Sequence, residues 1–539
     1  MTLRAPRAER LLAWAAALVG VIGLVSALTP EIASRVELVG GILPPGWPEA
    51  ARVVTVACAL GLIWLSRSLA RRRRRAWQLA VAVVVASAVA HLAKGLDFEE
   101  ATASLLLLVA LVRWRRRFDV PGDPASVRPL LGLGAALAAL AAVGVAAELG
   151  GAALPHRAAD ALTGLGLVLG LLAVHFWLRP FGQAVAQTVS DRRAARALVE
   201  AYGRDSLAFF ALRRDKSYLF SPSRRAFLAY RVVAGTALVS GDPVGEEAEL
   251  DALLAELVRL VRARGWRLAV VGASEGSLDR YRALGLRPLP LGEEAVLRPE
   301  RFSLEGRAIR KVRQSVSRLR RAGFSFRVVA SDEVDPALEA ELELVSAAWR
   351  RGQPERGFSM AIDDLRAPGT VLALAVGEDG RVGGFLHLAP VPAGGGWSLS
   401  TMRRRPDAPN GLTEFLVAET LAWARAAGAS ELSLNFCAFA DLLAVERATT
   451  WWRRLARRGL LLADNAFQLE RLYAFNRKFF PEWRRRYICV ERFGDLPAVG
   501  LAYLHAESLL VPPGPWARRR GAGRHRPAAR EPVRRPSGP

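Results

Sequence analysis

Cysteine is scarce in this chain, and so are the motifs that commonly mark ATP or zinc chemistry. The 539 residues include 3 cysteines, Cys58, Cys437 and Cys489, which lie far apart without a CxxC pair. This spacing argues against a disulfide framework and a structural zinc site, and it fits a reducing compartment. The sequence also contains no Gly-Lys-Ser/Thr phosphate loop and no HExxH helix, so it lacks these two routes to ATP or metal chemistry.

Acidic residues are few compared with basic ones. The chain has 75 Lys and Arg but 51 Asp and Glu, a net charge of +24, and 52% of its residues are hydrophobic. High hydrophobicity and high basic charge rarely share one soluble domain, so we expect a membrane part joined to a basic part. The surplus basic charge predicts an anionic partner, with anionic lipid and nucleic acid as the two obvious classes.

Long apolar runs are confined to the first third of the chain. They cover 11–28, 53–65, 77–93, 101–114, 130–147 and 158–178. A membrane-spanning helix needs about 20 residues, so we predict an α-helical membrane bundle of about six spans over 1–180. The alternative is five spans, if the short run at 101–114 does not cross. Because further spans follow the first run, we expect that run to be a retained anchor rather than a signal peptide.

Basic loops indicate the orientation of these spans. Arginines precede the first run, fill the loop at 71–75 and follow the fourth run at 113–117, whereas 30–49 and 150–155 carry few positive charges. The positive-inside rule then places the N-terminus and everything after Arg179 in the cytoplasm, in a multi-pass protein of a bacterial cell membrane. An even number of spans fits this pattern, which favours six.

Ionisable residues interrupt the apolar region between the third and fourth runs. They are His91, Lys94, Asp97, Glu99 and Glu100. Charged groups near a membrane are candidates for function. An ordinary solvated loop is the simpler interpretation, and we favour it.

A strand–turn–helix–strand pattern occurs twice after residue 205. The first copy covers 239–271. In the second copy, a strand over 397–402 leads into three arginines, a turn at 409–411, an amphipathic helix and a strand over 432–436. Free backbone N–H groups at the start of that helix form a natural anion site. We therefore predict an α/β region in which one fold unit is used twice.

The domain organisation follows from these segments. We predict a connecting helix, a first unit, a basic linking helix, a second unit that carries the chemistry, and a disordered basic tail. These cover 181–204, 205–300, 301–323, 324–510 and 511–539, respectively. The basic face of the linking helix has few compensating acids, and both phosphate contact and simple solvation stay open for it.

Six stretches form a recognisable set. They are GDPVG from Gly241, GRAIRKVRQSVSRLRRAGF from Gly306, ERGFSM from Glu355, MRRRPDAPNGLTEFLV from Met402, LSLNFCAF from Leu432 and FNRKFFPEWRRRY from Phe475. In this order, they resemble the catalytic domain of the phosphatidylglycerol lysyltransferase family, also known as lysylphosphatidylglycerol synthases or multiple peptide resistance factors. The stretch HLAKGLDFEEA from His91 resembles the membrane part of the same family.

The resemblance implies a fold and an activity. The implied fold is a membrane bundle followed by two tandem N-acetyltransferase-like units. The implied activity is transfer of an aminoacyl group, lysyl or alanyl, from aminoacyl-tRNA to a hydroxyl of phosphatidylglycerol in an anionic membrane. Such transfer changes membrane charge and gives resistance to cationic antimicrobial peptides. Because the aminoacyl ester is already activated, we expect no cofactor and no metal; which amino acid is transferred, and whether the chain forms a homo-oligomer, stay open.

The sequence departs from the family pattern in several places. Ser400 stands where an acidic residue is often found, and Asn476 stands where many members have lysine. The membrane part is short, and no lysyl-tRNA synthetase domain follows, so charged tRNA is expected to come from elsewhere. These departures keep two alternatives open: a lipid transporter or scaffold without catalysis, and a transferase of the same fold with another acceptor.

The resemblance also implies candidate site residues. The catalytic candidates are Glu355, Arg403 and Lys478, and the substrate-binding candidates are Arg313, Arg318, Arg356, Arg404, Asn410, Gly411, Asn435 and Arg486. The basic side chains suit phosphate or tRNA acceptor-end contacts, and Glu355 suits an acid–base role or binding of the substrate α-amino group. Solvated loops, surface ion pairs and ordinary turns are the competing explanations. His387 lies on an apolar strand, and we expect it to be a core residue.

Overall fold

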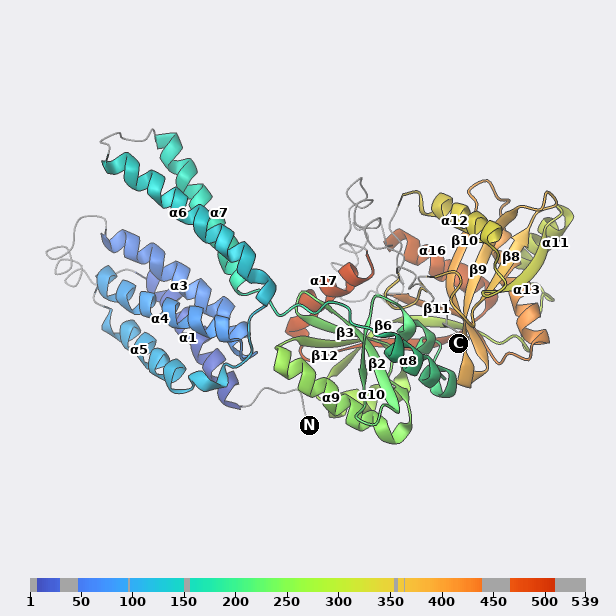
Figure 1. Cartoon of the computed structure of the whole chain (residues 1–539), viewed down its shortest axis with the longest axis horizontal. Coiled ribbons are helices and arrows are strands. Elements are labelled where there is room, and N and C mark those ends of the chain that lie inside the picture. The colour runs from blue at the N-terminus through green and yellow to red at the C-terminus, as the bar shows by residue number, and fades with distance from the viewer. Residues whose placement is uncertain are drawn as a thin grey trace, which may run out of the picture.

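The computed structural model describes residues 7–29, 47–95, 97–149, 156–352, 357–362, 364–438 and 466–508. These residues form two regions, a set of long helices and a region built on one twelve-stranded sheet (Figure 1). The predicted fold class is therefore confirmed in its order, with helices first and a mixed α/β region after them.

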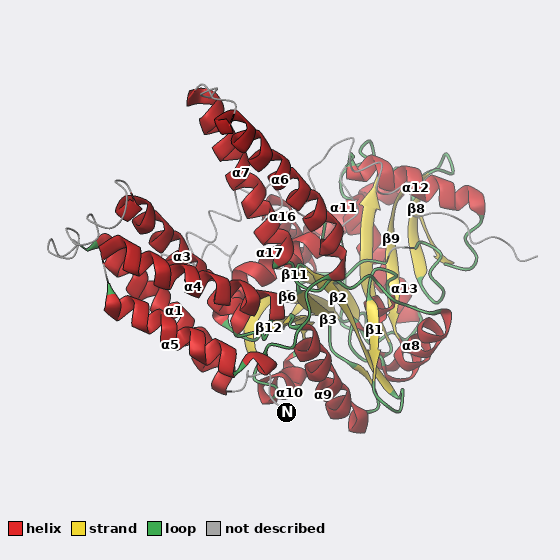
Figure 2. Cartoon of the chain, turned by 60° about the vertical axis from the view of Figure 1, so that its left-hand side comes forward, coloured by secondary structure: helices red, strands yellow, loops and turns green. Residues whose placement is uncertain are grey.

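The helical region contains six long helices among the described residues. They are α1 (Arg7–Leu28), α3 (Trp47–Leu69), α4 (Arg74–Gly95), α5 (Phe98–Arg113), α6 (Val127–Leu149) and α7 (His156–Trp177). Five are long and apolar enough to span a membrane, and the exception is α5 with 16 residues. The run predicted as the weakest span is thus a helix, but a short one. Helices α1, α3, α4 and α5 pack together, whereas α6 and α7 form a separate hairpin (Figure 2).

The sheet region is built from two halves. The first contains α8 (Val189–Tyr202), η3 (Ala208–Leu212), β1 (Ser217–Phe220), β2 (Ala226–Val233), β3 (Thr236–Ser240), β4 (Val244–Gly245), α9 (Glu247–Arg264), β5 (Arg267–Ala273), α10 (Leu278–Ala283) and β6 (Arg287–Leu297). The second contains α11 (Arg310–Arg321), β7 (Ser325–Ala330), α12 (Pro336–Arg350), β8 (Val371–Val376), β9 (Val382–Val391), β10 (Gly396–Arg404), α13 (Leu412–Ala426), β11 (Leu432–Ala438), α16 (Ala466–Asn476), β12 (Glu482–Val490) and α17 (Leu496–Ala506). Short 3-10 turns, such as η7 (Arg477–Phe479), join some of them.

The repeated unit predicted from the sequence is present in both halves. Strands β3 and β5 are parallel and joined by α9, and strands β10 and β11 are parallel and joined by α13. Helices α9 and α10 pack on one face of the first half and α17 on the other. In the second half, α11 and α13 share one face and α12 covers the other.

The last strand of each half pairs with strands of the other half. The strand order is β1-β2-β3-β5-β12-β6-β11-β10-β9-β8-β7. Strand β12 lies antiparallel between β5 and β6, and β6 lies antiparallel between β12 and β11. The two halves therefore exchange strands and form one continuous sheet instead of two separate ones.

A buried ion pair lies at this exchange. Arg486 on β12 donates from Nε to Glu294 on β6 at 2.8 Å, and from Nη1 to Asp205 at 2.8 Å. Ser206 and Ser433 each donate a hydroxyl to the same Glu294 carboxylate at 2.6 Å. Burial alone would raise the pKa of Glu294, but Arg486 and the two hydroxyls hold it below its ordinary value. Every buried charge here has a partner, as a low-dielectric interior requires.

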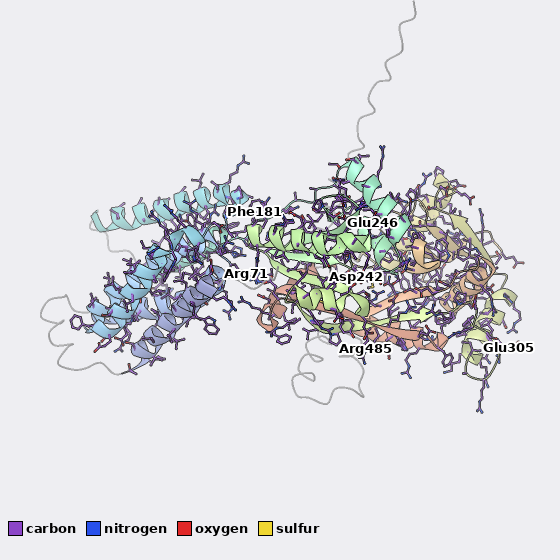
Figure 3. All side chains as sticks on the ribbon, turned by 90° about the horizontal axis from the view of Figure 1, so that it is seen from below. Arg71, Phe181, Asp242, Glu246, Glu305 and Arg485 are labelled. Carbon is purple, nitrogen blue, oxygen red and sulfur yellow. The ribbon has the colours of Figure 1, made fainter. Side chains whose placement is uncertain are left out.

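The basic loop between α3 and α4 joins the helices to the sheet region (Figure 3). The Arg71 guanidinium donates to the Trp266 carbonyl oxygen at 2.9 Å and to both carboxylate oxygens of Asp495 at 3.1 Å. Arg73 donates to the carbonyl oxygen of Gly265, and burial together with neighbouring cations lowers the pKa of Arg73 to about 9. Arginines expected only as orientation signals thus also hold the two regions together.

Two predicted helices begin later than the sequence indicated. The connecting helix was expected over 181–204, but α8 begins at Val189, where Thr188 and Asp191 form a capping box. The sequence predicts the basic linking helix over 301–323, but α11 begins at Arg310. Gly306 has a φ of +88°, which a helix does not allow, and Ile309 caps the helix with non-helical dihedrals. The predicted tail at 511–539 lies outside the described residues.

Replacing the buried Arg486 should destabilise the sheet region. We expect Arg486→Met to lower the free energy of unfolding by about 3–5 kcal/mol, because Glu294 would stay buried without its cation. Thermal denaturation of the purified full chain in detergent measures this. The matched control is Arg485→Met, since Arg485 is the exposed neighbour on the same strand. The Arg486→Met/Glu294→Met pair should recover much of the loss; equal effects of Arg486→Met and Arg485→Met would contradict the assignment.

Candidate functional site

The two parallel strand pairs of the sheet differ in how far they stay together. Strands β3 and β5 pair along all five residues of β3. Strands β10 and β11 pair only at Trp397 with Leu432 and at Ser398 with Ser433, after which they diverge. The second half therefore contains a wedge between two strands, while the first half is closed at the equivalent place.

Irregular backbone lines this wedge on both sides. On β10, the register against β9 shifts between Leu399 and Thr401, so Ser400 forms a bulge. On β11, Asn435 has a φ of +67°, and its side-chain amide donates to the Leu399 carbonyl oxygen at 2.8 Å. Bulges and left-handed residues are common beside active sites, where they redirect side chains and leave backbone groups unpaired. The candidate residue Asn435 thus bridges the two strands where they separate.

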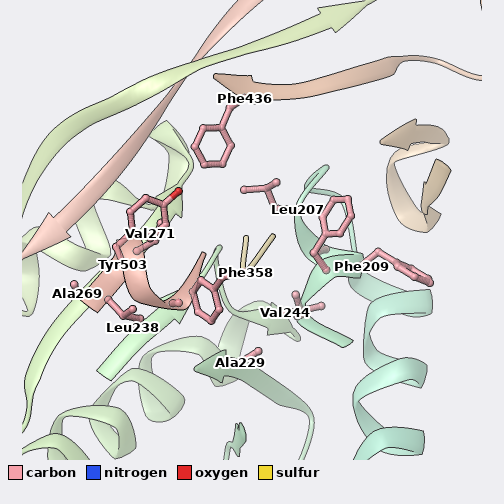
Figure 4. Packing of buried hydrophobic residues seen from close by; sticks show 14 of the residues in the cluster. Leu207, Phe209, Ala229, Leu238, Val244, Ala269, Val271, Phe358, Phe436 and Tyr503 are labelled. Carbon is pink, nitrogen blue, oxygen red and sulfur yellow. The ribbon is translucent and has the colours of Figure 1, made fainter. Parts of the chain in front are cut away.

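A short loop closes one side of the wedge. The backbone N–H of Ile362 donates to the Ser400 hydroxyl at 2.8 Å. Earlier in the same loop, the backbone N–H groups of Phe358 and Ser359 donate to the Glu507 carboxylate at 2.7 and 3.1 Å. Phe358 packs in one hydrophobic cluster with Phe436 of β11 and Tyr503 of α17 (Figure 4). The loop at 357–362 is therefore held by both β10 and the end of α17.

A cleft of about 730 Å³ opens between α12 and β10. The candidate Arg403 lines it and is 9% exposed. Arg214 from the first half also lines it and pairs with Asp364 at 2.9 Å. Acidic side chains of α12, among them Glu343, face the same space. The cleft thus combines cations with carboxylates, which suits a ligand that carries both phosphate and amino groups.

His387 lies beneath this cleft and is fully buried, as expected for a core residue. Its Nε2 is 2.8 Å from the Thr370 hydroxyl. Burial, and then the charge of Arg403, lower the pKa of His387 to about 4. The side chain is therefore neutral at physiological pH and does not line the cleft.

Several predicted binding residues gather instead at the start of α13. Arg318 donates to the Asn410 carbonyl oxygen at 2.6 Å, next to Gly411, which begins the helix with a φ of +94°. Lys478 pairs with Glu414 in the first turn of α13 at 2.7 Å. Burial would raise the pKa of Glu414, but Lys478 and the helix backbone hold it below its ordinary value. The helix start therefore already has a carboxylate of its own, which competes with an external anion.

The remaining predicted residues lie in other places. Arg404 donates to the Ala408 carbonyl oxygen at 3.2 Å, and Arg313 donates to the Leu304 carbonyl oxygen at 2.6 Å. Arg486 lies in the strand exchange, where it supports the sheet. Glu355 and Arg356 lie outside the described residues, between α12 and the loop at 357–362. The structure thus brings Arg403 to the cleft and Asn435 to the wedge. It gathers Arg318, Asn410, Gly411 and Lys478 at the start of α13.

Sequence reasoning missed Glu507 and Arg214. Glu507 holds the loop beside the wedge, yet it lies near the end of the second unit with no motif around it. Arg214 comes from the first half, and no local pattern connects it to Asp364, 150 residues away. Ser400 was noted as a departure from the family pattern, and its role as the bulge residue could not be read from that observation.

A second group of ionisable side chains lies in the helical region. The ligand atoms of His91, Asp97 and Glu100 all lie within 4.8 Å of one another, an arrangement that could hold a cation. His91 is 1% exposed, so the favoured interpretation of a simple solvated loop is wrong for this residue. The group belongs to α4 and α5 and is separate from the cleft beside β10.

Comparisons with known proteins find matches over most of the chain. Residues 196–490 match the family model described as phosphatidylglycerol lysyltransferase, C-terminal. The chain is 34% identical, over 98% of its length, to 54% of a lysylphosphatidylglycerol biosynthesis bifunctional protein LysX from Mycobacterium sp. (strain KMS). It is 40% identical, over 67% of its length, to 31% of the LysX protein from Mycobacterium avium (strain 104). The chain thus spans about half the length, or less, of the curated relatives it matches.

Two solved structures share the fold. One is the C-terminal domain of a putative lysylphosphatidylglycerol synthetase from Agrobacterium fabrum, with a TM-score of 0.50 and 27% identity over 58% of this chain and 96% of that one. The other is L-PGS from Bacillus licheniformis, with a TM-score of 0.53 and 22% identity over 60% of this chain and 97% of that one. Both similarities cover nearly the whole of the solved chains.

Removing the Ser400 hydroxyl should loosen the loop beside the wedge. We expect Ser400→Ala to speed amide exchange at 357–362 by about fivefold, the effect of losing one hydrogen bond worth about 1 kcal/mol. Hydrogen–deuterium exchange with mass spectrometry measures it. Ser398→Ala is the matched control, because the Ser398 hydroxyl on the same strand is buried without a partner among the described residues. Unchanged exchange in Ser400→Ala would show that the Ser400 hydroxyl does not hold the loop.

Proposed function

The chain belongs to the phosphatidylglycerol lysyltransferase family, and from this premise we propose that it transfers an aminoacyl group, lysyl or alanyl, from aminoacyl-tRNA to a hydroxyl of phosphatidylglycerol. The observation that carries the proposal is the wedge between β10 and β11, beside the cleft that Arg403 lines. Both lie within the part of the chain that matches the family model. A site where two strands separate can admit an extended substrate and offer it unpaired backbone groups.

The reaction needs no activation step. The lipid hydroxyl oxygen attacks the ester carbonyl carbon of the charged tRNA, and the bond to the terminal ribose oxygen breaks. The proton of the lipid hydroxyl finally resides on that ribose oxygen, so an ester is exchanged for an ester. Holding the two reactants in place can contribute about 7–11 kcal/mol in the best cases, and a donor to the developing oxyanion about 3–4 kcal/mol.

Arg403 is the residue we propose for contact with the reacting end of the tRNA. Its position in the cleft, together with its nearly complete burial, favours a strong interaction with a phosphate or an oxyanion. Glu355 and Arg356 precede the loop at 357–362 in the sequence, and we propose that they contribute to the aminoacyl pocket. Either Glu355 or the substrate α-amino group would take the proton. Lys478 and Arg404 have partners within the protein, so their proposed role is indirect: they hold the start of α13 and the turn before it in place.

The body of the tRNA needs a larger basic surface. The exposed side of α11 and the turn before it offer Arg307, Arg310 and Lys311, which form no ion pair with the described residues. Val312 and Val316 bury the opposite side of the same helix. We propose this face as a phosphate-contacting surface, whose binding would weaken steeply with added salt.

The location that suits this reaction is the cytoplasmic face of a bacterial membrane. The carboxyl ends of α3 and α7 and the amino end of α4 meet the sheet region, and the arginines at 71–75 lie at that junction. By the positive-inside rule, such a basic junction faces the cytoplasm, where charged tRNA is available. Modified lipid would carry less negative charge and so attract cationic peptides less.

The direct test is transfer by the purified full chain. Radiolabelled lysyl-tRNA and alanyl-tRNA are supplied separately with phosphatidylglycerol vesicles, and label entering the lipid is measured. Label in lipid supports the proposal and names the amino acid. Transfer only to another acceptor, or from no aminoacyl-tRNA at all, would overturn it in favour of the two alternatives.

Replacing Arg403 should remove most of the activity. We expect Arg403→Ala to cut the transfer rate by about 100-fold or more, as for loss of a preorganised donor at a developing charge. Initial rates at saturating lipid measure this, with thermal denaturation as the folding check. Arg405→Ala is the matched control, because Arg405 is two residues away and pairs with Asp407. A wild-type rate in Arg403→Ala would remove this residue from the site.

A further inference from the structure

A second and larger cavity lies where the helices meet the sheet region. Its volume is about 960 Å³. It is bounded by the last turns of α3 and α7, by the linker at 178–184, by the turn between β2 and β3, and by one side of α17. None of its lining residues belongs to the cleft beside β10.

We propose that this cavity binds the acceptor phospholipid, with its anionic headgroup, before transfer. The inference rests on the proposed function, since it assigns the place from which the lipid hydroxyl is presented. The size of the cavity suits a headgroup with the glycerol and the upper part of the acyl chains.

The cavity lies at the level where the membrane-spanning helices end. Helix α7 ends at Trp177 and α3 at Leu69, and both helices have the length and hydropathy of membrane spans. Trp64, in the last turns of α3, lines the cavity and is 53% exposed. Tryptophan favours the boundary between acyl chains and headgroups. The cavity therefore opens at the level where a lipid headgroup lies.

The polar lining favours a negative charge. Arg179, His175 and His505 line the cavity, whereas Asp123 is the one carboxylate among the described residues that line it. That carboxylate is nearly buried and already pairs with Arg179 Nε at 3.3 Å, which leaves the other edge of the guanidinium to a ligand. Arginine suits phosphate because its planar group can donate two parallel hydrogen bonds. We therefore assign the lipid phosphate to the side of Arg179.

Part of the apolar lining comes from α17. Leu501 of this helix is 59% exposed although it lines the cavity, and Ala498 lies one turn earlier on the same side. Val232 and Val233 face them from β2. An exposed leucine beside a membrane edge gains most if it is covered by lipid, because burial of apolar area is favourable.

Helix α17 also connects this cavity to the wedge. His505 lies in its last turn and lines the cavity, while Glu507, two residues later, holds the loop at 357–362. That loop is bonded to the bulge residue Ser400. The carbonyl end of a helix favours hydroxyl donors over a second anion. A lipid with its phosphate at Arg179 would thus direct its glycerol hydroxyls toward the end of α17 and the wedge.

Photo-crosslinking in membranes tests the position of the lipid. The full chain carries a photoreactive residue at Leu501, in vesicles of equal phosphatidylglycerol and phosphatidylethanolamine, and adducts are identified by mass spectrometry. The control carries it at Val189 of α8, which is 67% exposed and lies outside the cavity. We expect phosphatidylglycerol adducts at 501 in excess over both phosphatidylethanolamine and position 189. If neither excess is observed, the proposal is overturned.

Kinetics of cavity variants give an independent readout. Ala498→Trp fills the cavity, and His505→Glu places an anion in it. Each should raise the KM for phosphatidylglycerol by about tenfold. For Ala498→Trp this is the effect of losing about 50–60 Å² of apolar contact, and for His505→Glu it is an electrostatic repulsion of the same size. The KM for aminoacyl-tRNA should not change. Unchanged lipid KM in both variants overturns the site.

The two measurements separate this inference from the proposed activity. Crosslinking to phosphatidylglycerol without any transfer by the wild-type chain would leave the lipid site standing and reject the proposed function. Normal transfer without crosslinking at 501 would support the proposed function and reject the lipid site.

Discussion

The exchange of β6 and β12 between the two halves is the constraint on which the sheet region depends. Neither half can complete its sheet alone, because β12 fills the place beside β5 and β6 fills the place beside β11. The buried pair of Arg486 and Glu294 lies on these two strands and links them a second time. A buried pair of this kind adds little net stability but strongly disfavours any arrangement that separates its members. The exchange thus fixes the register of both halves at once.

A fixed sheet allows one strand pair to stay open. A gap between parallel strands leaves backbone groups without their ladder partners, which costs free energy unless the surrounding structure holds them in place. In this chain the closed pair of β3 and β5 and the exchanged strands lie on one side of the gap, and β9 supports β10 on the other. The Asn435 side chain donates to one carbonyl oxygen that has no ladder partner, and the Ser400 hydroxyl accepts a hydrogen bond from the loop at 357–362. The first half therefore acts as the rigid support for an opening that only the second half has.

Features that depend on a local sequence pattern could be predicted, whereas features that depend on long-range contacts could not. The repeated strand–helix–strand unit, the helix from Leu412 and the apolar helices were predictable, because each has its own periodicity and turn residues. The strand exchange was not, since the boundary predicted between units at 301–323 assumes that each sheet is made by consecutive residues. The same limit applies to the site. Arg403 was found through its motif, whereas Arg214 and Glu507 reach the cleft and its loop from distant parts of the chain.

Counting charges overstates how many of them are available to a polyanion. The net charge of the sequence suggests that its arginines and lysines are available to bind lipid or RNA, but many of them have partners within the protein. Arg71 holds the helices against the sheet region, Arg486 holds the strand exchange, and Lys478 pairs with Glu414. Each of these contacts partly neutralises a cation and lowers the potential that it presents at a distance. In the proposed function, the attraction for a charged RNA and an acidic lipid therefore depends on where cations lie more than on how many there are, with Arg403 in the cleft beside β10 and Arg179 in the cavity beside α17.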